Sequence, residues 1–578
     1  MGTISAPMAS STRSTSVWHL PIIASIGSLV SIGVTGFVVG VRNDIYYFPI
    51  LNALYNEPQF ANDAFVQSLR YFSSGLWLLL SGAAHRVDTY FLLLFLDFVS
   101  RLISFLGFIA CASLLGLKGW RPWALLTTLL CSTALLRGQS LAGDGGLFIN
   151  YFTHSEIANG LTLILLFFVI RGWIVAAVVV NGLVFFINAF IGAWDAVMLG
   201  VSMAIMTWRG IFNWRQVLTR GLVGTALALP LLAPVIRNIL ANPAFGKPID
   251  FDYVAYLEEF WPYHFIFGDI SIGEKIGLTS IVALGLLAFV RLGRQGVPFI
   301  VAMTAFAGLY VIGIFVPAFT HDPLVLNLHL LRVSTMLQLL AILGSLALAT
   351  RWWFSESPAY KYFFSPLLIL LLCAPIKMTT VQPAVHCALA ILLVAASFYP
   401  SVEARIPSWL RGNNLRLNYA ALVVAVIGLL AISVRSAISN VLAQTWHREW
   451  EAVGNWARDN TAPNATFLVR TWNFRDKPAS TQPGGEENEA ILNSGAFESI
   501  AHRVVWIDFR DGAAVLWLPS YYKEWHQRVS EVNSLASFAA KTSYARDKGI
   551  KYLVDVCESN AERKPVFSTK RLCVYSLS

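Results

Sequence analysis

Runs of about 20 mostly apolar residues recur between residues 19 and 438 of this chain, with short polar stretches between them. A helix of that length spans the hydrocarbon core of a bilayer. Of the 578 residues, 56% are hydrophobic and only 13% are charged, which is too little charge to cover a soluble protein of this size. The pattern predicts a polytopic α-helical membrane protein, and the long continuous runs favour helices over a β-barrel.

A window of about 20 residues predicts about thirteen transmembrane helices. Their ranges are 19–41, 88–112, 121–137, 156–171, 173–190, 193–208, 219–240, 275–291, 297–318, 329–350, 362–377, 383–400 and 418–438. Most basic residues between them fall on one side, which the positive-inside rule makes cytoplasmic: Lys118, Arg121, Arg171, Arg209, Arg215, Arg220, Arg291, Arg294, Arg351, Arg405, Arg411 and Arg416. The exceptions, on the outer side, are Arg42, Arg70, Arg86, Arg137, Arg237 and Arg332.

Three regions follow from this pattern: a disordered cytoplasmic tail at 1–16, a transmembrane domain at 17–440 and a soluble external domain at 441–578. The first span is expected to be an uncleaved anchor, because it is too long for a signal peptide and lacks a small-residue cleavage site. The net charge of +9 reflects the membrane anchors and gives no reason to expect nucleic acid as a partner.

The external region has the pattern of a small α/β domain. We expect a helix that ends at Asn460, strands at 465–469, 503–509, 551–556 and 571–577, and one helix across 521–549 that ends in a Gly549 cap. Cys557 and Cys573 lie in the last two strands. An oxidising compartment permits a disulfide between them, and two unpaired buried thiols are the alternative.

Asp44 is the candidate catalytic residue. It follows directly on the first apolar run, so its carboxylate stands at the outer mouth of a membrane span, where an ionisable group is costly unless it is used. At that depth a polar reaction can meet a lipid-borne substrate.

Other polar side chains gather on the same outer side. The candidates for substrate binding are Asp63, His154, Glu156, His264, His329 and Arg332. Carboxylates accept protons from hydroxyl groups, arginine and histidine neutralise phosphate, and the many aromatic rings of these loops can stack on sugars. Such a set suits a sugar and a phosphate, although solvated loop carboxylates are an ordinary alternative.

Metal binding has only weak support. Asp250 and Asp252 alternate in the third outer loop as carboxylate ligands of a divalent cation do, but alternation in an aqueous loop is a weak signal. No cofactor is certain, and a divalent cation stays open. Inside the second span, Asp97 and Arg101 are four residues apart on one helical face, and we expect them to pair.

On these residues the chain resembles the GT-C superfamily of membrane glycosyltransferases. Asp44 in RNDIYYFP matches the acidic residue of the first outer loop, Glu156 in HSEIANG or, less well, Asp144 matches the second-loop acid, and Arg332 in HLLR matches a late basic position. The Trp450–Thr461 segment also resembles the start of the external domain in bacterial GT-C-like proteins. A WWD-type acceptor signature and a paired-acid motif in the second loop are missing, which leaves the acceptor and metal dependence open.

The resemblance implies a glycosyltransferase of the bacterial inner membrane with a periplasmic C-terminal domain. A polyprenyl-phosphate sugar would be the donor, and an envelope glycan or lipid would be the acceptor. Asp44 would take the acceptor proton, while Arg332 with His329 would stabilise the leaving phosphate. The alternatives are a lipid or glycan flippase or transporter, and a non-catalytic envelope-assembly scaffold. Transporters place charges at the midplane of repeated halves, a pattern not evident here.

Overall fold

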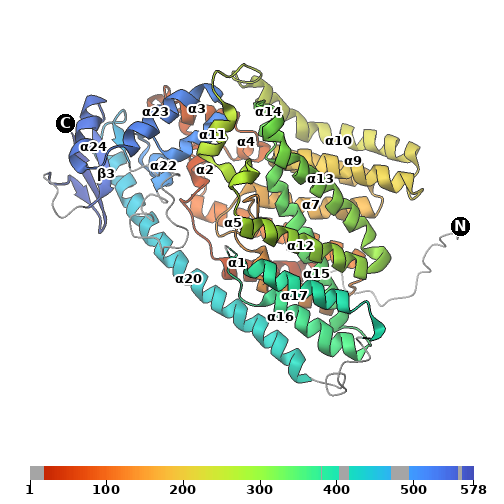
Figure 1. The fold of residues 1–578 in the computed structure, drawn as a ribbon. Coiled ribbons are helices and arrows are strands. Elements are labelled where there is room, and N and C mark those ends of the chain that lie inside the picture. Colours follow the sequence, from red (N-terminus) through yellow and green to blue (C-terminus); the bar gives the residue numbers. More distant parts are fainter. Residues whose placement is uncertain (1–17, 379, 402–414, 470–493, 558–562, 578) are drawn as a thin grey trace.

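The computed structural model describes residues 18–378, 380–401, 415–469, 494–557 and 563–577. The predicted tail at 1–16 and the basic residues Arg405 and Arg411 lie outside the described residues. A large helical bundle forms most of the molecule, and a small sheet with its helices lies at one end (Figure 1). The long helix α20 (Leu415–Asn460) runs along the edge of the bundle and joins the two parts.

Each predicted span overlaps one helix of the bundle. These are α1 (His19–Thr35), α5 (Thr89–Leu114), α6 (Trp120–Ser132), α7 (His154–Ile170), α8 (Ile174–Ile187), α9 (Ala189–Trp208), α10 (Trp214–Ala241), α12 (Ile272–Arg291), α13 (Val297–Phe319), α15 (Ser334–Trp353), α16 (Ser365–Cys373), α17 (Gln382–Ala396) and α20. Among the described residues, 7 helices are long and apolar enough to cross a membrane, by length and composition. The chain is therefore a multi-pass helical membrane protein, and thirteen crossings stay a prediction.

Helix α15 forms the centre of the bundle. Every side chain from Ser334 to Thr350 is buried, and a helix that is apolar all round needs such a surrounding. Gly285 of α12 lets the two helices approach closely, because a Cβ there would lie 2.4 Å from the Cα of Ala341. In contrast, α10 and α20 expose rows of apolar side chains, as expected of helices that face lipid.

Short helices in the predicted outer loops cover one end of the bundle (Figure 1). They are α2 (Asp44–Leu51), α3 (Ala64–Ser68), α4 (Gly75–Leu80), α11 (Tyr253–Phe260) and α14 (Pro323–Leu326). The first of them follows a helix shorter than the predicted 19–41. Helix α1 ends at Gly36, whose φ of 77° is a left-handed conformation that favours glycine, and whose N–H donates to Ile32 O.

A five-stranded mixed sheet organises the C-terminal part. Its strands are β1 (Thr466–Leu468), β2 (Val504–Val505), β3 (Tyr552–Val556), β4 (Phe567–Ser568) and β5 (Leu572–Ser576), in the order β2-β1-β3-β5-β4. Strand β1 is parallel to β2 and β3, and β5 is antiparallel to β3 and β4. The sequence pattern did not predict the two-residue strand β4.

The single helix predicted across 521–549 is wrong, because the structure has two: α23 (Tyr522–Asn533) and α24 (Phe538–Asp547). The hydroxyl of Ser537 accepts a hydrogen bond from Ala540 N and so caps a new helix start. Gly549 has a φ of 70°, in agreement with its expected role after the helix end.

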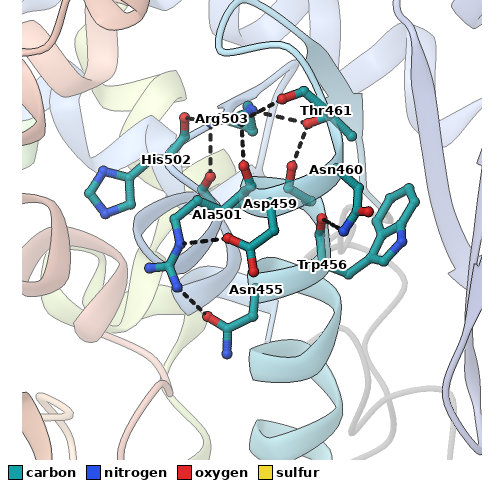
Figure 2. A network of polar contacts seen from close by, with 10 residues as sticks. Asn455, Trp456, Asp459, Asn460, Thr461, Ala501, His502 and Arg503 are labelled. Atoms are coloured by element: carbon teal, nitrogen blue, oxygen red, sulfur yellow. Dashed lines mark hydrogen bonds and ion pairs between the residues drawn. The ribbon is translucent and has the colours of Figure 1, made fainter.

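Arg503 fixes the end of α20 to this sheet, as Figure 2 shows. Its guanidinium donates to the carbonyl oxygens of Arg458 and Thr461 near the helix end and to the hydroxyl of Thr461. It also donates to the carbonyl oxygens of Ala501 and His502, just before β2. One buried arginine thus satisfies carbonyl groups that a helix end leaves without partners. The predicted domain boundary at residue 441 falls inside this continuous helix.

Cys557 and Cys573 are joined by a disulfide in the structure, with their Cα atoms 5.0 Å apart. The bridge connects the end of β3 to β5, its antiparallel neighbour. The other cysteines are buried free thiols of the bundle: Cys111, Cys131, Cys373 and Cys387.

Candidate functional site

Asp44 is held by the turn that precedes it. Its Oδ2 accepts hydrogen bonds from the N–H groups of Gly40 (2.7 Å) and Val41 (3.2 Å). The side chain of Asp44 is buried, and its Oδ1 has no hydrogen-bond partner among the described residues. Gly40 must be a glycine here, because its φ is 77° and a Cβ would lie 2.3 Å from His447 Nδ1 of α20. One carboxylate oxygen is therefore anchored by the backbone, and the other is buried without a partner in the part of the chain that the structure describes.

Burial raises the pKa of Asp44 from 3.8 to about 7. The two backbone hydrogen bonds and the charge of Arg510 act in the opposite direction and keep the rise smaller. A carboxyl group that titrates near neutral pH is suited to accept a proton from a reacting hydroxyl group.

His154 contacts Tyr47 of helix α2, which begins at Asp44. Its Nδ1 lies 3.0 Å from the hydroxyl oxygen of Tyr47, and its Nε2 lies 3.3 Å from Asn188 Nδ2. The amide of Asn188 is oriented by its oxygen, which accepts from the N–H groups of Phe190 and Ile191. Since the amide nitrogen can only donate, the neutral ring of His154 carries its proton on Nδ1 and donates to Tyr47. The hydroxyl proton of Tyr47 is then available to another acceptor.

Asp144 and Arg332 come together from the second and fourth outer loops. Two glycines allow the Asp144 loop to pack on the start of α15: a Cβ at Gly143 would lie 2.1 Å from Leu331 O, and one at Gly145 would lie 2.1 Å from Thr335 Oγ1. The charge of Arg332 interacts with Asp144, and the buried Nε of Arg332 finds no hydrogen-bond partner within the described ranges of the chain.

His264 and His329 stand beside this pair. His264 Nε2 lies 3.4 Å from Asp144 Oδ2, which also accepts from Trp261 Nε1 at 2.9 Å. Burial and the charge of Arg332 lower the pKa of His264. The ring of His329 packs between Phe190 and Phe265, with centroid distances of 4.8 and 4.6 Å.

Backbone strain gathers at the same place. Arg42, Asp144 and His329 all have φ near 50°, a left-handed conformation that is uncommon for residues other than glycine. Such strain persists where the surrounding structure holds it, and it is frequent at functional sites.

A cavity of about 220 Å³ adjoins the Asp44 turn. Its polar wall includes Arg42, Arg137 and Tyr151, and Val34 of α1 and Ile432 of α20 close its apolar sides. Asp44 itself does not line the cavity. Tyr151 does line it, and this tyrosine interacts electrostatically with both Asp44 and Arg42. The volume accommodates a small anionic headgroup next to two guanidinium groups.

Two of the residues predicted at the site lie elsewhere. Glu156 Oε1 is 2.9 Å from Arg101 Nη1, whereas the Asp97 carboxylate is 3.8 Å from Arg101 Nε. Arg101 therefore has its predicted partner Asp97 and a closer one in Glu156. Asp63 caps α3 by accepting from Val66 N, and its electrostatic neighbours are Arg528 and Glu524 of the C-terminal part. Burial raises the pKa of Asp63 to about 6.

The weak metal candidates do not converge. Asp250 pairs with Lys523, and Asp252 caps α11 while it contacts His321 Nδ1 at 3.2 Å. Among the described residues, no group of three or more His, Cys, Asp or Glu side chains is placed to hold a metal ion.

Sequence reasoning missed Tyr47, Tyr151 and Arg510. The two tyrosines had no signal beyond their outer loops. Arg510 lies far along the chain, and only the fold brings it to the first loop.

No model of a protein family matches this chain, and no curated protein matches it. Among solved structures, the chain is similar to ArnT from Cupriavidus metallidurans in the apo state, with a TM-score of 0.46, 11% identity and coverage of 96% of this chain and 97% of that chain. The same ArnT bound to undecaprenyl phosphate gives a TM-score of 0.47 and 13% identity over 98% of this chain and 99% of that chain. The arabinofuranosyltransferase AftD from Mycobacteria gives 0.41 and 14% identity, over 93% of this chain and 35% of that chain. Because every TM-score is below 0.5, the chemistry has to rest on this chain's own residues.

Proposed function

We propose that this chain is a GT-C-type glycosyltransferase that moves a sugar from a polyprenyl-phosphate donor to an envelope glycan or lipid on the periplasmic side of a bacterial inner membrane. The observation that carries the proposal is the buried Asp44 with one unpartnered oxygen beside an arginine-lined cavity. The resemblance of RNDIYYFP and HLLR to the GT-C pattern supports it.

Asp44 would act as the general base. With a pKa of about 7, the carboxyl group is ionised in a large share of molecules at neutral pH and still basic enough to take a hydroxyl proton. The free Oδ1 is the atom that would receive this proton, while Oδ2 stays anchored on the Gly40 turn.

The arginines would hold the phosphate. Arg42 and Arg137 line the cavity between α1 and α20, and both helices expose apolar side chains on their outer faces, as a site for a lipid headgroup requires. Arg332, with its unpartnered Nε, would neutralise charge on the leaving phosphate.

A flippase is the less favoured alternative. A transported charge needs polar groups along its path through the bilayer centre. The deep charges of Asp97, Arg101 and Glu156 pair with one another instead. This triad is an ion-paired cluster inside the bundle, whereas Asp44 and Arg332 of the proposed site belong to the predicted outer loops.

Mass spectrometry of envelope glycans and lipids, in cells with and without the protein, tests the proposal. We expect one sugar modification to disappear in the deletion strain and to return when the wild-type chain is supplied. A glycan and lipid profile that does not change would contradict a transferase.

A further inference from the structure

One short segment of the C-terminal part contacts three outer loops at once. This segment is the helix η12 (Phe509–Leu516) with Trp517, and we call it the docking segment. Its carbonyl oxygens accept hydrogen bonds from Tyr46 (to Arg510 O, 3.2 Å), Tyr256 (to Gly512 O, 2.7 Å), Asn327 (to Leu516 O, 2.6 Å) and Asn242 (to Trp517 O, 2.7 Å). The indole N–H of Trp517 donates to Ser68 Oγ at 2.9 Å.

These contacts come from the first, third and fourth outer loops, which also carry Asp44, His264 and Arg332. The docking segment therefore sets how the loops of the candidate site lie relative to one another. Its own conformation is fixed by Asp508 and Asp511, which form a reciprocal capping box at its start.

The docking segment places the cationic side chain of Arg510 against the turn that precedes Asp44. Its Nη1 lies 3.5 Å from the carbonyl oxygen of Arg42, two residues before Asp44. The turn it touches is the one whose N–H groups anchor the Asp44 carboxylate. Arg510 also interacts with Asp508, its neighbour in the docking segment.

We propose that Arg510 is a positioning residue for Asp44, so that the catalytic site is completed by the C-terminal domain. This inference rests on the proposed function. The charge of Arg510 favours the ionised form of Asp44, so a docked C-terminal domain keeps a larger share of this base ionised near neutral pH.

Several groups besides Arg510 act on Asp44 or on its turn, and each of them also influences the pKa of Asp44 or the shape of the turn. They are Arg42 and Tyr47 of the same loop, Tyr151 of the second loop, Asp508 beside Arg510 and His447 of α20 against Gly40. Arg510 contacts Arg42 O in the Asp44 turn, and its charge acts on Asp44.

The test uses the full chain in lipid nanodiscs with three variants: Arg510→Gln, Arg510→Lys and, as a control, Arg546→Gln on the exposed face of α24. The rate of sugar transfer is followed from pH 5 to 9. The charge of Arg510 lowers the pKa of Asp44, so we expect its loss to move the acid limb of the profile to higher pH, by up to about one pH unit. That shift means an up to roughly tenfold lower rate at pH 6 and an unchanged rate at pH 9. Arg510→Lys and Arg546→Gln should keep the wild-type profile.

A second readout needs no substrate. The melting temperature of Asp44→Asn is compared with that of its parent in the wild-type and Arg510→Gln backgrounds. Asparagine mimics the protonated acid. At pH 8, Asp44→Asn should therefore raise the melting temperature more in the Arg510→Gln background than in the wild-type background. At pH 5, where Asp44 is protonated in both backgrounds, the two effects should be equal.

The two readouts separate the two proposals. If wild-type protein transfers no sugar at any pH, the proposed function fails and the melting cycle alone decides on Arg510. A melting cycle with no difference between pH 5 and pH 8 overturns the role of Arg510, and so does an acid limb that Arg510→Gln leaves in place.

Discussion

Replacing Gly143 with alanine should disable the site without removing any functional group. The added Cβ would lie 2.1 Å from the carbonyl oxygen of Leu331, against an ordinary non-bonded separation of about 3.5 Å. The Asp144 loop and the start of α15 would have to separate by about 1.4 Å, which is the difference between these two distances. Backbone lies on both sides of the contact, so no side-chain rotation relieves it.

Two effects follow from this separation. Overpacking of this kind costs about 1–3 kcal/mol of stability. A displacement of about 1 Å between Asp144 and Arg332 is large enough to lower catalysis by about 100-fold. The same loop offers a matched control in Gly146, where a Cβ would lie 3.2 Å from the flexible end of Ile149.

The assay compares sugar transfer and the melting temperature of Gly143→Ala, Gly146→Ala and wild type, all in nanodiscs. We expect Gly143→Ala to lose transfer and to melt at a lower temperature, while Gly146→Ala remains close to wild type. Full transfer by Gly143→Ala would refute the placement of Asp144 against Arg332, and an equal loss in Gly146→Ala would refute the argument from the close contact.

Further predictions concern stability and pH. In the Asp97–Arg101–Glu156 triad, Arg101→Met should lower the free energy of unfolding by about 3–5 kcal/mol, because it leaves two buried carboxylates without a cation. Glu156→Gln should cost about 1.5–3 kcal/mol, and Asp97→Asn should cost less, since Asp97 is farther from Arg101. Any other order of the three melting temperatures would contradict this. Arg503→Met should lower the melting temperature, because the partners of Arg503 are carbonyl groups at the end of α20. The acid limb of the pH profile for sugar transfer should stay in place. A shifted acid limb would show that Arg503 acts on Asp44. The pKa of Asp44 is about 7 in the folded protein and 3.8 in the unfolded chain. The stability of the wild type relative to Asp44→Asn should therefore fall as the pH rises from about 4 to 7, and then level off. A rise over that range would mean that folding stabilises the ionised form of Asp44.

The helices of the bundle could be predicted because hydropathy is a local property. Each predicted span overlaps one helix, and errors fall at the ends, where single residues such as Gly36 decide. The helix across 521–549 shows the same limit, since one capping serine divides it.

The site could be predicted only in part. Asp44 was predicted from its position alone, and Arg332 and His264 from their loops, and their roles stay predictions. The arginines predicted on the outer side, against the positive-inside rule, were a usable signal: Arg42 and Arg137 line the cavity, and the charge of Arg332 interacts with Asp144. The ion pair of Glu156 with Arg101 was not predicted, because the two residues lie on different helices and spacing along one helix gives no information about it. The pairing of Arg510 with the first loop depends on tertiary structure and leaves no local pattern.

The most direct test of the account is the envelope glycan and lipid profile of cells that carry only the Asp44→Asn variant. Asparagine can still accept the hydrogen bonds of Gly40 and Val41, so the protein should fold and reach wild-type levels in the membrane. The account predicts a profile that matches the deletion strain, because the base that takes the acceptor proton is gone. A wild-type profile in these cells would contradict it.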